Sequence, residues 1–182
     1  MGRRSVADRG FTIAEVLIAM MLIAVAAIGV AEVFGASIRA TNAARVRTDA
    51  ARLASQKMEQ LLSLTWRFDR AGLGLSESDT TSDLSYDPPR SGGAGLSPSP
   101  AGTLDANVAG YVDFTDASGG WVGQGAAVPP SAVYLRRWRV APLALDPLDS
   151  IVLQVLVRAV SAASPSAAAD VVLTSVRTRK AA

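Results

Sequence analysis

The chain has 182 residues, which leaves room for one modest domain beside any membrane segment. It contains no cysteine and no histidine, and this excludes disulfides, thiol nucleophiles, imidazole bases and the commonest soft-metal ligands. The sequence pI is 9.4, but removal of residues 1–10 leaves 15 basic and 15 acidic side chains. The basic pI therefore belongs to the first ten residues and does not indicate a polyanion-binding protein.

An apolar segment covers residues 11–31, and Glu15 is the only charge within these 21 residues. As a helix rising 1.5 Å per residue it is about 31 Å long, enough to cross a bilayer's hydrocarbon core. Because a charge inside a membrane is costly unless it is paired, Glu15 is a candidate functional residue. A secretory signal peptide cleaved after Ala26 and a plain single-span anchor are alternatives. Neither explains Glu15, and apolar residues continue past Ala26.

The string Gly10-Phe11-Thr12-Ile13-Ala14-Glu15 follows a short basic leader and opens the apolar segment. It resembles the class III signal of type IV pilins and type II secretion pseudopilins, with Ala14 where a larger aliphatic residue is more usual. The resemblance implies that a prepilin peptidase cleaves between Gly10 and Phe11 on the cytoplasmic side and methylates the new Phe11 amine. It also implies that Glu15 meets the Phe11 amine of a neighbouring subunit and sets the axial register of a filament.

The absence of proline before Pro88 allows one helix to continue to about Leu64, about 80 Å at 1.5 Å per residue. We expect a transmembrane half over residues 11–35 and an amphipathic half over residues 36–64. In the second half, apolar side chains recur at helical spacing, and that face is predicted to pack on a folded domain or on neighbouring helices. These side chains are Val46, Ala50, Leu53, Ala54, Met58, Leu61 and Leu62.

Residues 65–109 are rich in Ser, Gly and Pro and predict a long variable loop, with Trp66 and Phe68 folding back onto the domain. Residues 110–182 predict an antiparallel β-sheet region. Its strand-like segments are 132–141, 150–160 and 170–178, separated by 142–149 and 161–169, with a shorter one at 110–114. Three or four strands lying on the amphipathic half of the helix would give an α+β, pilin-like fold.

The chain offers few groups for chemistry. The glycine cluster at residues 120–125 lacks a Walker lysine and a following helix, so it reads as a turn. Asp105, Asp113 and Asp116 match no defined calcium loop, and solvated turn carboxylates are the preferred interpretation. We therefore predict no catalytic residue, no metal ligand and no cofactor.

The one basic–aromatic cluster consists of Arg136, Arg137, Trp138 and Arg139, a candidate contact for single-stranded DNA. On a strand, alternation would place Arg136 with Trp138 on one face and Arg137 with Arg139 on the other. A structural strand whose arginine stems cover apolar surface is favoured, and nucleic-acid binding is disfavoured.

Together these observations predict a minor pilin-like subunit that is not an enzyme and carries a leader peptide at residues 1–10. We expect it to cross the bacterial inner membrane once, with the C-terminal domain periplasmic or extracellular, and to enter a filament after assembly. The expected partners are prepilin peptidase and other pilins or pseudopilins. The alternatives are a minor pseudopilin of a type II secretion system, a competence pseudopilus subunit, and a membrane-anchored exported protein.

Overall fold

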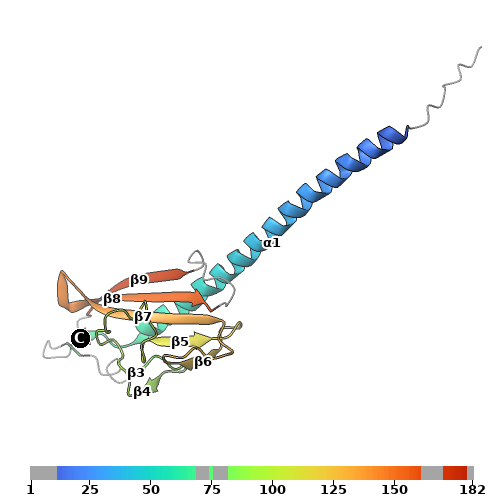
Figure 1. Cartoon of the computed structure of the whole chain (residues 1–182). Helices are drawn as coiled ribbons and strands as arrows, with labels where there is room; N and C mark the ends of the chain where they lie inside the picture. Colours follow the sequence, from blue (N-terminus) through green and yellow to red (C-terminus); the bar gives the residue numbers. More distant parts are fainter. Residues whose placement is uncertain (1–11, 69–73, 76–81, 161–169, 180–182) are drawn as a thin grey trace, which may run out of the picture. The chain divides into compact units, whose positions relative to one another are not determined.

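The computed structural model describes residues 12–68, 74–75, 82–160 and 170–179 (Figure 1). The chain forms two compact units, Met1–Ala43 and Ala44–Ala182. A single helix, α1 (Ile13–Ser63), begins one residue after Thr12, which confirms the predicted long helix to within a residue or two. The helix contains no proline, and Gly29 and Gly35 are its only glycines, so nothing in its sequence interrupts the backbone hydrogen bonds.

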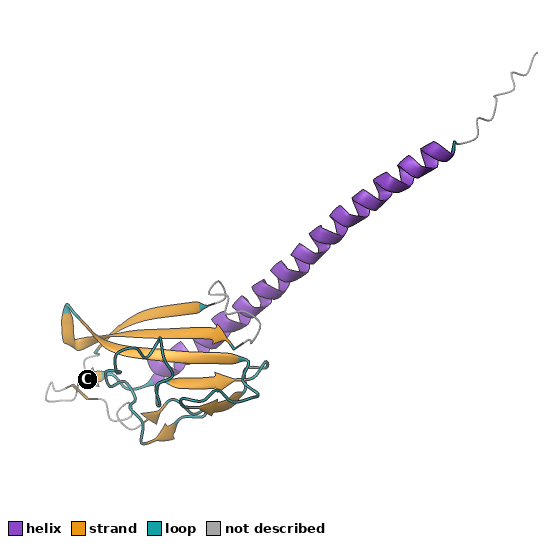
Figure 2. Ribbon diagram, viewed as in Figure 1, coloured by secondary structure: helices purple, strands orange, loops and turns teal. Residues whose placement is uncertain are grey.

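Five antiparallel strands form the main sheet, in the order β6-β5-β7-β8-β9 (Figures 1 and 2). Two short hairpins, β1-β2 and β3-β4, lie in the connection between α1 and this sheet. The fold is therefore α+β, as predicted, with one long N-terminal helix and a small antiparallel sheet. The strands are β1 (Arg67–Phe68), β2 (Gly74–Leu75), β3 (Ser82–Asp83), β4 (Arg90–Ser91), β5 (Val112–Thr115), β6 (Trp121–Gln124), β7 (Tyr134–Leu143), β8 (Asp146–Ala159) and β9 (Val171–Thr178).

Two predictions about the sheet are wrong. The connection predicted over 142–149 is shorter, because β7 ends at Leu143 and β8 begins at Asp146. Leu143 pairs with Asp146, with a bulge after Pro142. The bulge accommodates a proline that cannot donate a ladder hydrogen bond. The glycine cluster at 120–125 is likewise mostly strand, since β6 pairs with β5 at Gly123. A Cβ at Gly123 would lie 2.8 Å from the Pro129 ring, so the glycine makes room for that ring. With β6 included, the sheet has five strands instead of three or four.

The C-terminal half of α1 packs into the core of the second unit. Its buried face includes Ala50, Leu53, Ala54, Met58 and Leu61, which confirms most of the predicted apolar face. Leu62 was predicted on that face but is 39% exposed, because it lies on the edge of the contact. The same cluster contains the sheet residues Tyr134, Trp138, Val140, Ile151, Leu153, Val155 and Val157.

The connection after the helix contributes more to the core than its composition predicts. Leu84 and Leu96 are fully buried in the main cluster, although the segment has few apolar residues. Trp66 also lies in this cluster, and its indole Nε1 donates to the Asp149 carbonyl at 3.3 Å. Trp66 therefore folds back onto the domain, as predicted. Phe68 is half-buried.

Candidate functional site

The first turn of α1 is closed by a reciprocal pair of side chains. The Thr12 hydroxyl accepts from the Glu15 backbone N–H at 3.3 Å, and Glu15 Oε2 accepts from the Thr12 backbone N–H and from its hydroxyl, both at 2.9 Å. This is a capping box, in which a threonine N-cap and a glutamate three residues later satisfy each other's free backbone donors. The same sequence that predicts a processing signal therefore also starts the helix.

The helix that follows has an uncovered apolar surface. Leu17, Met21, Val33 and Phe34 are each more than 60% exposed. A window of 18 residues has a mean hydropathy of 2.6, and none of it is buried within the described chain. By length and composition α1 is the one helix among the described residues that can cross a membrane.

A comparison with protein families gives the N-terminal segment its class. Residues 7–31 match the prokaryotic N-terminal methylation motif. This match shows the class III prepilin signal of type IV pilin-like proteins, followed here by the long helix and small antiparallel sheet of a pilin-like arrangement. The motif implies processing by prepilin peptidase and assembly with other pilins, and the single apolar helix fits a membrane-anchored pilin. Searches of curated proteins and of solved structures found no match.

The structure describes only one of the predicted site residues at the N-terminus, Glu15. Gly10 and Phe11, the predicted cleavage and methylation residues, lie outside the described residues, as does the leader over residues 1–10. Glu15 lies in the first turn of α1, four positions after Phe11. Both of its hydrogen bonds end on Oε2, and Oε1 has no partner among the described residues. Within the part of the chain that the structure describes, this oxygen is left to accept from another molecule.

The structure divides the basic–aromatic cluster between two faces of β7, as strand alternation predicts. Arg136 and Trp138 are fully buried on the face toward α1. Arg137 lies on the other face and is 8% exposed; its guanidinium donates to Asn107 Oδ1 and to the Leu104 carbonyl. Arg139 is the exposed member of the four. DNA contact stays a prediction, and only Arg139 presents its guanidinium to solvent.

Three buried charged side chains join α1 to the sheet, and the sequence analysis did not anticipate them as a group. Asp113 of β5 accepts from Lys57 Nζ at 2.7 Å and from Arg136 Nε and Nη2 at 2.6 and 2.8 Å. All three side chains have no exposed surface. Lys57 Nζ also donates to the Leu84 carbonyl at 2.7 Å and lies 4.5 Å from the centre of the Trp138 ring. We call Lys57, Asp113 and Arg136 the buried ion cluster.

Burial is the main influence on Lys57. Desolvation lowers the pKa of its amine, while the neighbouring Asp113 carboxylate acts in the opposite direction and favours the charged form. The sequence did contain a signal for this position. Lys57 falls within the apolar spacing of Ala50, Leu53, Ala54 and Leu61, so it could not reach solvent if that face were buried.

The aspartates that the sequence analysis considered as calcium ligands lie in different surroundings. Asp113 was interpreted as a solvated turn carboxylate, which is wrong, because β5 is buried along its whole length. Asp116 does lie in a turn, where its Oδ1 accepts from the backbone N–H groups of Ser118 and Gly120. These hydrogen bonds lower the pKa of Asp116. Among the described residues no group of three or more acidic side chains is placed to hold a metal ion.

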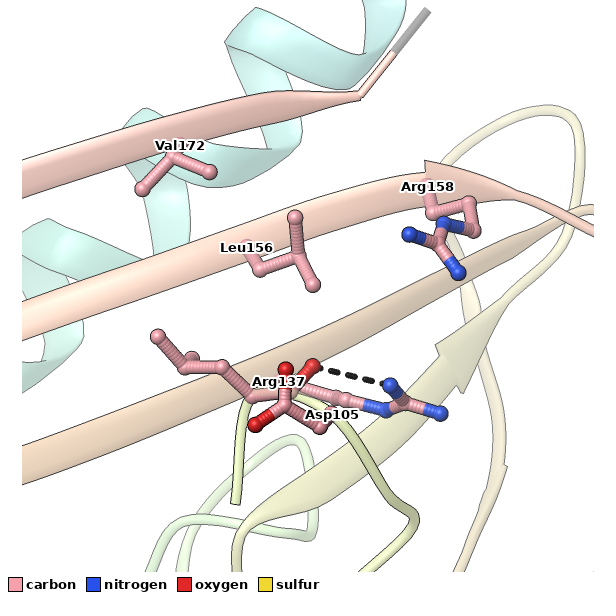
Figure 3. Close-up of a pocket in the computed structure, with 6 residues that line it drawn as sticks. Asp105, Arg137, Leu156, Arg158 and Val172 are labelled. Carbon is pink, nitrogen blue, oxygen red and sulfur yellow. Dashed lines mark hydrogen bonds between the residues drawn. The ribbon is translucent and has the colours of Figure 1, made fainter. Parts of the chain in front are cut away.

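A shallow hollow on the outer face of the sheet contains Arg137 and one further arginine, Arg158 (Figure 3). Arg137 and Arg158 line it together with Asp105, Leu156 and Val172. Both guanidiniums already have partners, since Arg158 makes a bidentate pair with Asp170 at 2.6 and 3.0 Å. The guanidiniums of Arg137 and Arg158 in this hollow are therefore both held by groups of the same domain.

Proposed function

We propose that this chain is a minor pilin-like subunit that prepilin peptidase processes between Gly10 and Phe11 and methylates at Phe11. The processed subunit would then join or initiate a type IV pilus filament. The observation that carries the proposal is the match of residues 7–31 to the methylation motif, at the start of a helix with an uncovered apolar surface. The role is structural, because the exposed apolar face of the helix provides a contact surface for other subunits.

The capping box supports a specific role for Glu15 in assembly. An isolated carboxylate in hydrocarbon is costly, and in the single chain the two donors of Thr12 partly satisfy it. The free oxygen Oε1 would accept from the Phe11 amine of a neighbouring subunit. At 1.5 Å per residue, this contact displaces the neighbour by about 6 Å along the helix axis. Glu15 would therefore be tolerated in the membrane before assembly and fully paired after it.

The division of α1 supports the proposed membrane arrangement. We assign the membrane-spanning half to residues 11–35 and the amphipathic half to residues 36–64, whose apolar face is covered by the sheet. The C-terminal domain would then lie on the periplasmic or extracellular side. A minor pseudopilin of a type II secretion system would share all of these features. A competence pseudopilus subunit would in addition bind DNA, and Arg139→Gln is the informative variant because Arg136 and Trp138 are buried.

Mass spectrometry of the mature N-terminus tests the proposal directly. The protein is purified from cells that contain the natural assembly machinery, and its N-terminal peptide is sequenced. We expect a chain that begins with N-methylated Phe11 and retains the apolar helix. A mature chain that begins after Ala26 would show a cleaved secretory signal and would refute the filament role.

A further inference from the structure

The strand β9 forms one edge of the main sheet, and among the described residues it pairs only with β8 (Figure 1). The Arg179 N–H donates to the Asp149 carbonyl at 2.8 Å, one position beyond the paired residues Ser150 and Thr178. Hydrogen-bonded and non-hydrogen-bonded pairs alternate along an antiparallel ladder. The odd-numbered residues of β9 therefore direct their backbone groups toward β8, and the even-numbered residues direct theirs away from the sheet.

Four residues of β9 thus present backbone N–H and C=O groups along the edge of the sheet. We call them the outward row: Val172, Thr174, Val176 and Thr178. Within the described part of the chain, no backbone hydrogen bond outside the ladder ends on these groups. A row of unpaired donors and acceptors on an extended strand is a template for one further strand.

The strand β9 lacks the features that usually protect a sheet edge, which are short length, prolines, bulges and exposed charges. It is eight residues long, contains no proline, and keeps one register with β8 along its whole length. The outward row carries no charge, and Val172 and Val176 are 54% and 55% exposed. The only charged residue of the strand is Arg177, which lies on the opposite face and donates to the carbonyls of Leu61 and Leu64.

The opposite edge of the sheet is protected in several of these ways. The strand β6 has only four residues, and its pairing with β5 shifts register between Phe114 and Thr115. The Pro129 ring lies against Gly123 of this strand. A short, bulged strand is a poor template for a further strand. The contrast singles out β9 as the open edge of the described sheet.

The apolar core is also incompletely covered at β9. Val171 and Leu173 pack against the main cluster on the face toward α1, yet both remain partly exposed. On the other face, the valines of the outward row are exposed. An added strand would place its alternate side chains beside both rows, because neighbouring strands interact through cross-strand pairs on each face. Uncharged, β-branched or other apolar side chains would fit both sides.

We propose that β9 binds an extended segment of a second protein, which adds to the sheet as a sixth strand. In such strand addition, main-chain hydrogen bonds supply affinity and alternate side chains supply specificity. The outward row provides the main-chain groups, and the partly exposed apolar residues on both faces provide the side-chain contacts. The segment must lack proline where its N–H groups meet the outward row.

The added strand belongs to a different protein and not to the β9 of a second copy. Every pair in this sheet is antiparallel, which is also the more stable pairing. Within the domain, α1 runs in the direction of β9: the Tyr134 hydroxyl, at the level where β9 begins, contacts Asp49, and Arg177 near its end contacts Leu64. Antiparallel pairing of two β9 strands would therefore oppose the two helices. Subunits anchored in one membrane share one direction, so this step rests on the proposed function.

Amide hydrogen exchange of the full chain in detergent tests whether the edge is open. Exchange at single residues is read by fragmentation in the mass spectrometer. We expect the N–H groups of the outward row to exchange at least about 100-fold faster than those of the odd-numbered residues 173–177, which bond β8. Equal protection of the two sets would overturn the proposal, because the edge would already be occupied within the chain.

Photo-cross-linking in cells that contain the natural assembly machinery tests the occupant. A photoreactive amino acid replaces Val172 in the full chain, and the cross-linked peptide is sequenced. Thr174→Pro removes one outward N–H, which an edge strand tolerates. Thr174→Val is the matched control, since both variants lose the hydroxyl that contacts Gln154 but only valine keeps the N–H. We expect Thr174→Pro to lower the cross-link at least about tenfold and Thr174→Val to leave it within about twofold.

A second variant covers the case in which Thr174→Pro does not fold. Val176→Lys changes no backbone group and places a charge on the exposed row, as protected edges do. It should also lower the cross-link. Support requires that the cross-linked peptide is an uncharged, extended segment of another protein and that these variants lose it; capture alone is not support. A peptide from a second β9, a cross-link that survives both variants, or no cross-link would overturn the proposal.

The state of the N-terminus separates this inference from the proposed function. If the chain carries N-methylated Phe11 and the cross-link does not depend on the outward row, strand addition is wrong while the pilin-like role stands. If Phe11 is not methylated but the cross-link depends on the outward row, the proposed function fails and β9 is still a site of strand addition.

Discussion

Replacement of Asp113 by asparagine tests the buried ion cluster. Asp113→Asn keeps the shape of the side chain, but it removes the negative charge and turns one acceptor oxygen into a donor. Lys57 and the two donors of Arg136 then share the one side-chain oxygen left at position 113, and only Lys57 has a second acceptor, the Leu84 carbonyl. None of the three side chains reaches solvent. Removal of one partner of a buried ion pair costs about 3–5 kcal/mol, because an uncompensated charge stays behind.

This cost is large compared with the stability of an ordinary domain, which is about 5–15 kcal/mol. With an m-value of about 1.5 kcal/mol/M, the urea midpoint should fall by about 2–3 M. Unfolding of the full chain in detergent can be followed by tryptophan fluorescence, since Trp138 lies 4.5 Å from the Lys57 amine. Asp105→Asn is the control, because Asp105 is exposed and its loss should change stability by less than about 0.5 kcal/mol. If the midpoint of Asp113→Asn lies within about 0.5 M of that of the unmodified protein, the loss is below about 0.75 kcal/mol at this m-value, and the cluster does not form.

Three other predictions concern separate parts of the chain. Burial lowers the pKa of Lys57 below 10.5, so between the folded pKa and 10.5 the unfolded chain binds more protons. The urea midpoint of the unmodified protein should therefore rise with pH in that range, while the midpoint of Lys57→Met should not. If the midpoint of the unmodified protein instead falls with pH relative to that of Lys57→Met, the Asp113 carboxylate outweighs burial. Gly93→Ala should destabilise the domain by about 1–3 kcal/mol or more in the same assay, because its Cβ would lie 2.1 Å from the Asp83 Cα; an unchanged midpoint would contradict this close packing. Glu15→Ala and Glu15→Gln should both be processed yet incorporate poorly into sheared filaments. Because glutamine can keep the cap, normal incorporation of Glu15→Gln would assign Glu15 to capping alone.

The sequence predicts the local elements of this fold well and their joint contacts poorly. The helix over Ile13–Ser63 follows from the absence of proline and from the apolar spacing, which are properties of neighbouring residues. The strand β8 was predicted from Ser150 but begins at Asp146, because Asp146 pairs with Leu143 of β7 beyond Pro142. Prolines at a hairpin end are usually a signal for a connection, and here the bulge after Pro142 overrides it.

The buried ion cluster shows why part of the domain could not be predicted. Lys57 has a sequence signal, since it lies within the apolar spacing of the helix. Asp113 has a weaker one, because Val112 and Phe114 on either side of it enter a separate apolar cluster with Leu135. The sequence does not state that these two positions and Arg136 meet, since they are 56 and 23 residues apart and only the sheet topology brings them together.

The candidate site divides in the same way. Gly10, Phe11 and Glu15 could be predicted from the sequence because they belong to one contiguous string. The motif match over residues 7–31 confirms that this string is a prepilin signal.

The buried ion cluster also determines when the domain can finish folding. Lys57 is made early in synthesis, but its countercharge Asp113 is 56 residues later and the guanidinium of Arg136 is 79 residues later. Until both have left the ribosome, the lysine has no reason to leave water, and the helix face around it stays solvated. Such long-range closure slows folding and favours a single concerted step late in synthesis. On the proposed function the domain crosses the membrane before it folds, and this delay would give it time to do so. The chain has no cysteine, so no oxidising enzyme is needed to complete the structure afterwards.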